Sequence, residues 1–274
     1  LELAPIIKKF SPEVLVSYPS PSAYRVAYGL KIRIIGLNDS PHSTIVNRLC
    51  LPLVDCLIAP ACIAYDSFRR YLSPGAQYLT YDGVDEVLWM REAEGDPTIL
   101  RNLGLSPQDK IVIFRPPEEK ASYYHYDIPD YFKIMSTISG MGKVIFFPRY
   151  KYQELAVRRM FRGGNIIIPN RAIPLYKIYS LVSLVISGGA SMAREAALAG
   201  TPSISMFPRR LEVNEFLVEK GFPLYHIVEV DDILNTVIAV LKNPNKYKIR
   251  VSEILKNLQT PLDPLLKALP KLLE

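Results

Sequence analysis

A short segment in the second half of the chain, VISGGASMAREAALAGTPSIS (185–205), combines residue types that suit a nucleotide diphosphate. Gly188 and Gly189 follow an apolar run, and glycine lets the backbone come closer to a ligand than a residue with a Cβ does. An alanine-rich helix is expected to begin directly afterwards, and the unpaired N–H groups and dipole of a helix N-terminus attract phosphate. The amides expected to contact a diphosphate are those of Ala190, Ser191 and Met192.

Glu195 lies four residues after Ser191, about one helical turn further on. Its carboxylate can accept hydrogen bonds from the vicinal ribose hydroxyls of a nucleotide. The same residues have a simpler interpretation, because a Gly-Gly turn before a helix is common and Glu195 could be a solvated helix residue. Gly200 and Pro202 would end the helix and begin the next strand in either case. Spacing alone leaves both interpretations open.

Two arginines follow strand-like runs in the same half of the chain. Arg115 comes after IVIF and Arg149 after VIFFP, so both are expected at the carboxyl ends of strands. A guanidinium group there can pair bidentately with a phosphate, although each arginine alone fits a surface salt bridge equally well. Lys120, in the loop after Arg115, is a further expected phosphate contact.

The expected catalytic pair is Asp39 and His42, which lie three residues apart in GLNDSPHST after another strand-like run. A carboxylate or imidazole at this position can deprotonate an acceptor hydroxyl. Asp39 could equally cap the helix that follows, as an Asp-Ser-Pro run often does. His125 and His226 resemble ordinary loop and strand residues.

Other polar residues of the first half suit sugar hydroxyls. Ser17, Tyr18 and Ser20 lie in the SYPSPS loop, and Asp82 and Asp85 lie in YDGVDE. The two acids indicate sugar-hydroxyl or metal binding, although Asp-Gly is first of all a turn signal.

The elements that must position these residues form an α/β pattern, in which short apolar runs alternate with helix-length segments, as in a doubly wound parallel sheet. The expected strands of the first half are 13–18, 31–38, 56–60 and 76–83. Those of the second half are 110–116, 143–149, 165–170, 181–189, 202–208 and 224–230. The expected domains are 1–90, a linker at 91–110, a nucleotide-binding domain at 111–248, and C-terminal helices at 249–274.

Composition narrows the ligand class without choosing one ligand. The chain has 274 residues, 49% of them hydrophobic, and a formal net charge of +6, which suits phosphates, nucleic acid or an acidic membrane surface. Nucleic acid is not expected because no recognised binding module is present. The basic run between 143 and 177 is typical of a solvated face, but Leu155, Met160 and Phe161 within it are compatible with contact to acidic lipid.

The sequence indicates a cytoplasmic protein, with peripheral contact at the inner face of the membrane as an option. No apolar run reaches the roughly 18 residues of a membrane span. Cys50, Cys56 and Cys62 lack the spacing of a zinc site and indicate buried thiols in a reducing compartment. Because the sequence begins at Leu1 in what resembles the end of a helix, we expect the first domain to be incomplete.

The 188–202 segment resembles the donor-binding signature of GT-B glycosyltransferases and is similar to the matching region of UDP-N-acetylglucosamine 2-epimerases. The likeness lies in GGxSxxxEAxxxGxP. It implies two facing Rossmann-like domains, with the first on the acceptor side and the second holding the nucleotide. It also implies diphosphate contact from Gly188 to Met192, ribose contact at Glu195, and no metal or cofactor besides the nucleotide sugar as substrate.

Several separated motifs together resemble the domain of unknown function 354 family, which is GT-B-like and has no assigned reaction. These are SPSAYRVAYGL, NDSPHSTIVNRLCLPLVD, YDGVDEVLW, RPPEEKASYY, FFPR and GGASMAREAALAGTPSIS. The family resemblance names no substrate. The leading hypothesis for the chain is an enzyme that transfers a sugar from a nucleotide-diphosphate donor to a hydroxyl acceptor, with a lipid-linked acceptor as one option.

Two alternatives stay open. One is a nucleotide-sugar epimerase or hydrolase, although FFPRYKYQE supplies an arginine after its strand where that chemistry would use a histidine. The other is a non-catalytic nucleotide-sugar-binding protein. Neither the base, the sugar, the acceptor nor the oligomeric state is indicated.

Overall fold

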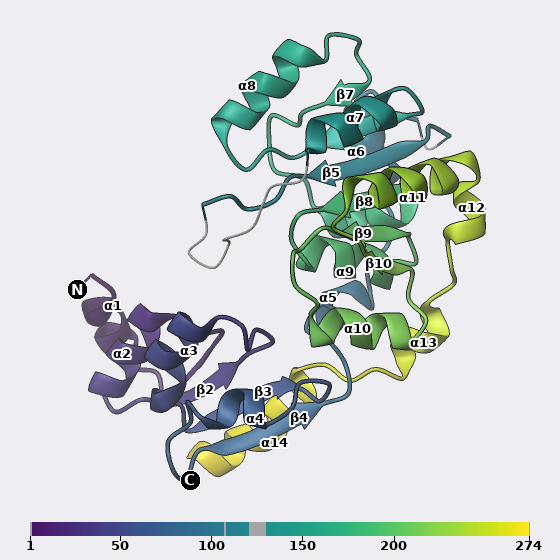
Figure 1. Cartoon of the computed structure of the whole chain (residues 1–274). Coiled ribbons are helices and arrows are strands. Elements are labelled where there is room, and N and C mark those ends of the chain that lie inside the picture. The colour runs from purple at the N-terminus through teal and green to yellow at the C-terminus, as the bar shows by residue number, and fades with distance from the viewer. Residues whose placement is uncertain (1, 107, 121–129, 274) are drawn as a thin grey trace. The chain divides into compact units, whose positions relative to one another are not determined.

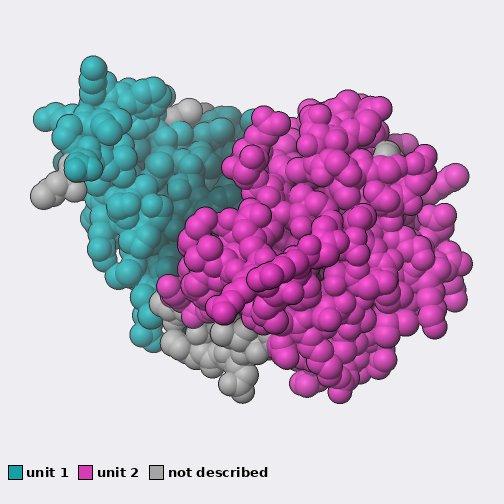
Figure 2. All heavy atoms as spheres, turned by 90° about the horizontal axis from the view of Figure 1, so that it is seen from above, with its two compact units in different colours: residues 1–88, 257–274 teal, residues 89–256 magenta. Residues whose placement is uncertain are grey.

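The computed structural model describes residues 2–106, 108–120 and 130–273 (Figure 1). His125 and part of the RPPEEKASYY motif lie outside the described residues. The chain divides into two compact units: unit 1 is Leu1–Leu88 with Asn257–Glu274, and unit 2 is Trp89–Lys256 (Figure 2).

Unit 1 is built on a parallel sheet in the strand order β1-β2-β3-β4. Its strands are β1 (Val14–Ser17), β2 (Arg33–Leu37), β3 (Cys56–Pro60) and β4 (Gln77–Tyr81). Its helices are α1 (Leu3–Phe10), α2 (Pro21–Gly29), α3 (Thr44–Cys50), η1 (Leu51–Leu53), α4 (Asp66–Arg69) and α14 (Leu262–Leu273), and α5 (Val87–Met90) spans its boundary with unit 2. Every residue of β3 is buried, as expected of a central parallel strand.

The last helix completes the core of unit 1. Leu265 and Ala268 of α14 pack with Ile35, Ile58 and Tyr81 of the sheet. The amphipathic pattern of α14 therefore covers one face of a sheet that begins about 250 residues earlier in the sequence.

Unit 2 is built on a parallel sheet in the order β10-β9-β8-β5-β6-β7. Its strands are β5 (Ile111–Arg115), β6 (Lys143–Phe146), β7 (Ile166–Ile167), β8 (Leu184–Ser187), β9 (Ser203–Ser205) and β10 (Leu224–His226). The chain runs outward from β5 to β7 and then returns to place β8 on the other side of β5. The β5–β8 pair is therefore the topological switch point, where ligands of open α/β sheets bind.

Helices pack on both faces of the unit 2 sheet. The helices of unit 2 are α6 (Pro97–Asn102), α7 (Tyr131–Ser139), α8 (Lys151–Met160), η2 (Leu175–Lys177), η3 (Tyr179–Leu181), α9 (Ser191–Leu198), α10 (Glu212–Glu219), α11 (Val230–Lys242), α12 (Pro244–Tyr247) and α13 (Ser252–Lys256). Val112 and Phe114 of β5 pack with residues of α7 and α11. Ser203 of β9, on the opposite face, donates a 2.8 Å hydrogen bond to the carbonyl of Ala193 in α9.

The units differ from the expected domains in two places. The expected linker 91–110 lies within unit 2, where it forms α6. Its Asp-Pro pair is a helix start, because Asp96 caps α6 by accepting a hydrogen bond from the Thr98 amide and Pro97 occupies the first turn. The expected C-terminal helices are also divided, since α13 belongs to unit 2 and α14 to unit 1.

The α/β fold class with parallel sheets agrees with the prediction from sequence. Cys50 and Cys56 are buried as expected, whereas Cys62 is half-buried. Within 2–106, 108–120 and 130–273, no helix combines the length and apolar character that crossing a bilayer requires.

Candidate functional site

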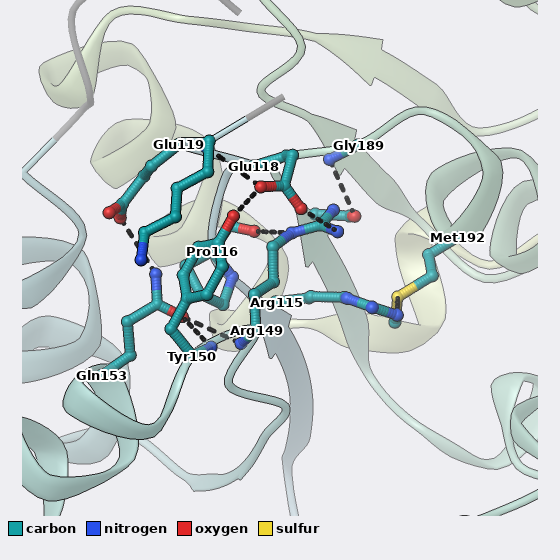
Figure 3. Close-up of polar contacts among 11 residues, drawn as sticks. Arg115, Pro116, Glu118, Glu119, Arg149, Tyr150, Gln153, Gly189 and Met192 are labelled. Carbon is teal, nitrogen blue, oxygen red and sulfur yellow. Dashed lines mark hydrogen bonds and ion pairs between the residues drawn. The ribbon is translucent and has the colours of Figure 1, made fainter. Parts of the chain in front are cut away.

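Three neighbouring strands of unit 2 bring the predicted ligand-binding residues to one edge of the sheet. Arg115 ends β5, Arg149 follows β6, and the glycine pair follows β8. The Gly188 amide donates a 2.9 Å hydrogen bond to the Arg115 carbonyl, which extends the β5–β8 pairing into the turn. A Cβ on Gly189 would lie 3.2 Å from Nη2 of Arg149, so that guanidinium lies directly beside the turn (Figure 3).

The two glycines meet different neighbours in the structure. Gly188 is buried, and a Cβ on it would lie 2.2 Å from the backbone N and Cα of Pro117. Its lack of a side chain therefore makes room for the Pro116–Pro117 loop. Gly189 is half-buried, and its amide already donates a 3.1 Å hydrogen bond to Oγ of Ser187.

The first turn of α9 presents the amides that the sequence analysis selected. Ala190 is the N-cap residue, and an alanine side chain cannot cap a helix. The first intrahelical hydrogen bond runs from the Arg194 amide to the Ala190 carbonyl. The amides of residues 191–193 therefore belong to the first turn, where N–H groups have no carbonyl partner within the helix. Ser191 is exposed, whereas Met192 is buried. The accessible part of this helix terminus is thus around Ala190 and Ser191.

Arg115 extends from β5 toward the same turn. Its Nη1 lies 3.6 Å from Sδ of Met192. Among the described residues, Nε of Arg115 is a buried nitrogen with no hydrogen-bond partner. An unsatisfied buried donor costs about 1–3 kcal/mol, and more when the group is charged, so the position favours an acceptor supplied from outside the chain.

Arg149 is held in place by the loop after β5. Its Nε donates a 2.9 Å hydrogen bond to the Pro116 carbonyl, and its Nη1 forms a 3.4 Å ion pair with Oε2 of Glu118. Gln153, buried in α8, accepts from the amides of Arg149 and Tyr150 at 2.8 and 3.2 Å. The guanidinium thus already has a carboxylate neighbour, which the sequence analysis did not anticipate.

Lys120 lies in the loop after β5, over two aromatic rings. Its ammonium lies 4.7 Å from the ring centroid of Tyr150 and 5.7 Å from that of Tyr152. The two rings stack at 5.5 Å between centroids. Cation–π attraction therefore accounts for the position of this ammonium group in the structure, and its contact with a phosphate stays a prediction.

Glu195 is half-buried, and two side chains donate hydrogen bonds to it. Its Oε2 accepts a 2.6 Å hydrogen bond from the Tyr179 hydroxyl, and its Oε1 accepts a 3.0 Å hydrogen bond from Nε1 of Trp89. A carboxylate has about four lone-pair positions, so two donors leave acceptor capacity for ribose hydroxyls. The two aromatic donors fix the orientation of the group.

In unit 1, the loop after β2 holds Asp39 and His42, both half-buried. Buried asparagines organise this loop: Asn38 donates to Asn47 at 2.8 Å and accepts from the Ser40 amide at 2.8 Å. The alternative role of Asp39 as a helix cap is wrong, because α3 begins after Ser43.

An acid that the sequence analysis assigned only to sugar or metal binding lies in a buried cluster of the same unit. Asp85 is 6% exposed and accepts a 2.5 Å hydrogen bond from the Tyr81 hydroxyl. Burial raises the pKa of Asp85 to about 6, and the negative charges of Asp39 and Glu86 act in the same direction. A carboxyl group that titrates near neutral pH suits proton transfer. Within the described part of the chain, no group of three or more His, Cys, Asp or Glu side chains could hold a metal ion.

Comparison with known proteins places this architecture in a family. The family model described as a protein of unknown function (DUF354) matches residues 1–267. The chain belongs to this family. An uncharacterized protein of Methanocaldococcus jannaschii, MJ0665, is 30% identical over an alignment of 244 residues, and the match covers 86% of this chain and 69% of that relative.

Solved structures share the fold of this DUF354 chain at low sequence identity. UDP-GlcNAc 2-epimerase from Neisseria meningitidis, bound to UDP-GlcNAc, has a TM-score of 0.69 and 13% identity. The match covers 98% of this chain and 79% of the epimerase chain. UDP-GlcNAc 2-epimerase from Methanocaldococcus jannaschii, with UDP-GlcNAc and UDP, has a TM-score of 0.65 and 16% identity, covering 95% and 74%. Anabaena HepE, with UDP-glucose, has a TM-score of 0.63 and 12% identity, covering 98% and 81%. The DUF354 chain therefore has the predicted GT-B-like α/β fold.

Several residues that hold the candidate side chains in the DUF354 chain were not functional candidates in the sequence analysis. In unit 2 they are Trp89, Glu118 and Tyr179, and in unit 1 the residue is Tyr81. Trp89 is the one tryptophan of the chain, which could have singled it out, but its partner Glu195 lies 106 residues away. Glu118 lies in the same loop as Lys120, but its pairing with Arg149 joins residues 31 positions apart and depends on the path of the loop.

Proposed function

We propose that the chain binds a nucleotide-diphosphate sugar at the β8–α9 turn of unit 2 and transfers the sugar to a hydroxyl acceptor. The observation that carries this proposal is the convergence of the α9 N-terminus with Arg115 at the switch point of the sheet. A helix terminus supplies N–H donors and a partial positive charge, and Arg115 adds a full charge with an unsatisfied buried Nε.

The ligand class is supported by the solved structures of the same fold. Two are UDP-GlcNAc 2-epimerases that contain UDP-GlcNAc, and a third contains UDP-glucose. The carboxylate of Glu195, held by two donors and with acceptor capacity left for ribose hydroxyls, also supports a nucleotide sugar.

Each proposed residue has a separate role in the transfer. The α9 amides, Arg115 and Arg149 stabilise the negative charge that develops on the leaving diphosphate. Glu195 binds the ribose. Asp39 or His42 removes the proton of the acceptor hydroxyl as the new glycosidic bond forms. In this proposal no metal ion takes part.

Epimerisation or hydrolysis of a nucleotide sugar is the second candidate. It is favoured by the number of UDP-GlcNAc 2-epimerases among structures of this fold. A nucleotide-sugar-binding protein without catalysis would use the same unit 2 residues. Products distinguish these functions, since transfer requires an acceptor whereas epimerisation and hydrolysis do not.

The binding step is tested by thermal denaturation with UDP-, GDP- and ADP-sugars. A ligand at about 100 times its Kd stabilises the fold by about 2.7 kcal/mol, which raises Tm by several degrees. Glu195→Ala should weaken that stabilisation, whereas Glu219→Ala, on the exposed side of α10, should not. Stabilisation by no nucleotide sugar would contradict the proposal. Nucleotide release is then measured with and without hydroxyl acceptors.

A further inference from the structure

Helix α8 of unit 2 has an outward side with an exposed leucine at its centre. The helix connects β6 to β7, the last strand at one edge of the unit 2 sheet, and lies at the periphery of that unit (Figure 1). Gln153 and Val157 are buried and form the inward side of α8. Leu155 lies on the opposite side of the helix and is 57% exposed.

Helix geometry fixes the neighbours of Leu155 on this outward side, because residues three and four positions apart lie next to each other. These neighbours are Lys151, Tyr152, Arg158 and Arg159, three of which are basic. The side chains of Lys151 and Arg158 are 74% and 54% exposed, and Arg159 is also exposed. Leu155 is therefore an apolar group surrounded mainly by cations.

The same segment has a clear excess of positive charge. Residues 151–162 contain four basic residues and one acid, Glu154. Two of the bases share that acid, since Glu154 pairs with Nζ of Lys151 at 2.9 Å and with Nε of Arg158 at 3.0 Å. Arg159 and Arg162 form no ion pair with another described residue. Two guanidinium groups are thus available to an anion from outside the chain.

The structure narrows the apolar part of this surface. Of the three apolar residues that the sequence analysis considered for acidic lipid, Phe161 is half-buried and packs against the core of unit 2. Met160 is 59% exposed but lies on a different side of α8 from Leu155. Leu155 is therefore the apolar group that the basic residues surround.

This combination of groups favours a lipid surface among the possible anions. In a bilayer the headgroup phosphates lie directly above the acyl chains, so arginines can pair with phosphate while a leucine enters the apolar boundary. The long arginine side chains allow both contacts at once, because their charged ends reach the headgroups from a helix that lies on the surface. A nucleic-acid backbone would pair with the same arginines but offers no apolar layer to Leu155.

We propose that the outward side of α8, formed by Lys151, Leu155, Arg158 and Arg159 and continued by Arg162, binds anionic phospholipid at a membrane surface. This inference goes beyond the proposed function and does not depend on it, because none of these residues belongs to the proposed nucleotide site. Headgroup phosphates pair with the basic side chains, and Leu155 enters the boundary of the acyl chains.

The test is co-sedimentation of the protein with vesicles of phosphatidylcholine and phosphatidylglycerol in equal parts, compared with vesicles of phosphatidylcholine alone. The wild type should bind the anionic vesicles and stay in the supernatant with the neutral ones. Arg159→Gln/Arg162→Gln should lower the partition coefficient about 10- to 30-fold, because each base near an anionic surface contributes roughly a factor of five. Leu155→Ser should lower it about three- to tenfold, because the apolar contact is lost while the charge is kept.

The matched control is Lys242→Gln/Lys246→Gln. These exposed lysines lie in α11 and α12, so the control removes the same two charges from the chain and leaves α8 intact. Its partition coefficient should stay within about twofold of wild type, because salt confines the attraction to bases close to the lipid. Circular dichroism melting curves check that each variant is folded.

Three results would overturn the proposal. The first is a wild type that does not bind anionic vesicles. The second is an equal loss of binding in the two double variants, which would assign the attraction to the overall charge of the chain. The third is tighter binding to a DNA duplex than to the vesicles, with neither affinity changed by Leu155→Ser. Each result leaves the proposed nucleotide site standing, because that site is measured by nucleotide binding.

Discussion

The indole Nε1 of Trp89 donates a 3.0 Å hydrogen bond to Oε1 of Glu195, and Trp89 is the one tryptophan of the chain. Its fluorescence therefore reports on the carboxylate proposed to bind ribose. Titration with a nucleotide sugar should change the emission intensity or wavelength in a saturable way. The signal should be insensitive to ligand in Glu195→Ala. A calorimetrically detected ligand that leaves the emission unchanged would place Glu195 away from the ligand.

Trp89→Phe should weaken nucleotide-sugar binding by about three- to tenfold, because the lost hydrogen bond to a charged acceptor also frees the orientation of Glu195. Tyr179→Phe removes the second donor and should act similarly. If Trp89→Phe binds the nucleotide sugar with wild-type affinity, the hydrogen bond from the indole does not contribute to orienting the Glu195 carboxylate. Binding is measured by calorimetry, which needs no tryptophan.

Arg115→Ala should lower nucleotide-diphosphate affinity by 30-fold or more, since loss of a charged hydrogen-bonding partner in a partly buried site costs about 2–5 kcal/mol. Arg115→Lys should recover only part of the affinity, because an ammonium cannot pair bidentately. The measurement is calorimetric titration at two salt concentrations. Equal affinities for wild type and Arg115→Ala would remove Arg115 from the site.

Asp85 should make stability depend on pH. Its pKa is about 6 in the folded chain against an ordinary value of 3.8, so between these values the folded state binds the proton more strongly than the unfolded state. The contribution to stability is thus present below about pH 4 and is lost as pH rises through about 6, by about 3 kcal/mol in all. Asp85→Asn should abolish this loss and be more stable than wild type at pH 8.

The pH dependence is measured by urea unfolding at pH 4.5, 6 and 8 for wild type and Asp85→Asn. Asparagine can still accept the Tyr81 hydrogen bond, so the comparison isolates the charge. If the free energies of unfolding of the two proteins differ by the same amount at all three pH values, burial does not raise the pKa of Asp85.

The paired glycines offer a matched comparison. Gly188→Ala should destabilise the fold by about 2–4 kcal/mol, because its Cβ would lie 2.2 Å from the Pro117 backbone, which cannot move aside as a side chain can. Gly189→Ala meets the Arg149 side chain at 3.2 Å and should cost about 1 kcal/mol or less. Its effect should fall on ligand affinity instead. Urea unfolding measures the stability of each variant and calorimetry measures its ligand affinity. An equal loss of stability in the two variants would contradict the different roles given to Gly188 and Gly189.

The sheets could be predicted because short apolar runs alternate with helix-length segments; the expected strand at 110–116 corresponds to β5 at Ile111–Arg115. The convergence of Arg115, Arg149 and the glycine turn followed from one rule, that parallel strands end at the same edge. The pairing of Glu118 with Arg149 did not follow, because it depends on the path of a loop. The return of α14 to unit 1 joins residues at opposite ends of the sequence, which local patterns cannot indicate.

The most direct test of the central claim is amide NMR of the 15N-labelled protein during titration with UDP, GDP and ADP. If a diphosphate binds at the N-terminus of α9, the resonances of Ala190, Ser191 and Met192 should shift saturably with the nucleotide. If a nucleotide binds by calorimetry while these resonances stay in place, the anion lies elsewhere and the proposed site is wrong.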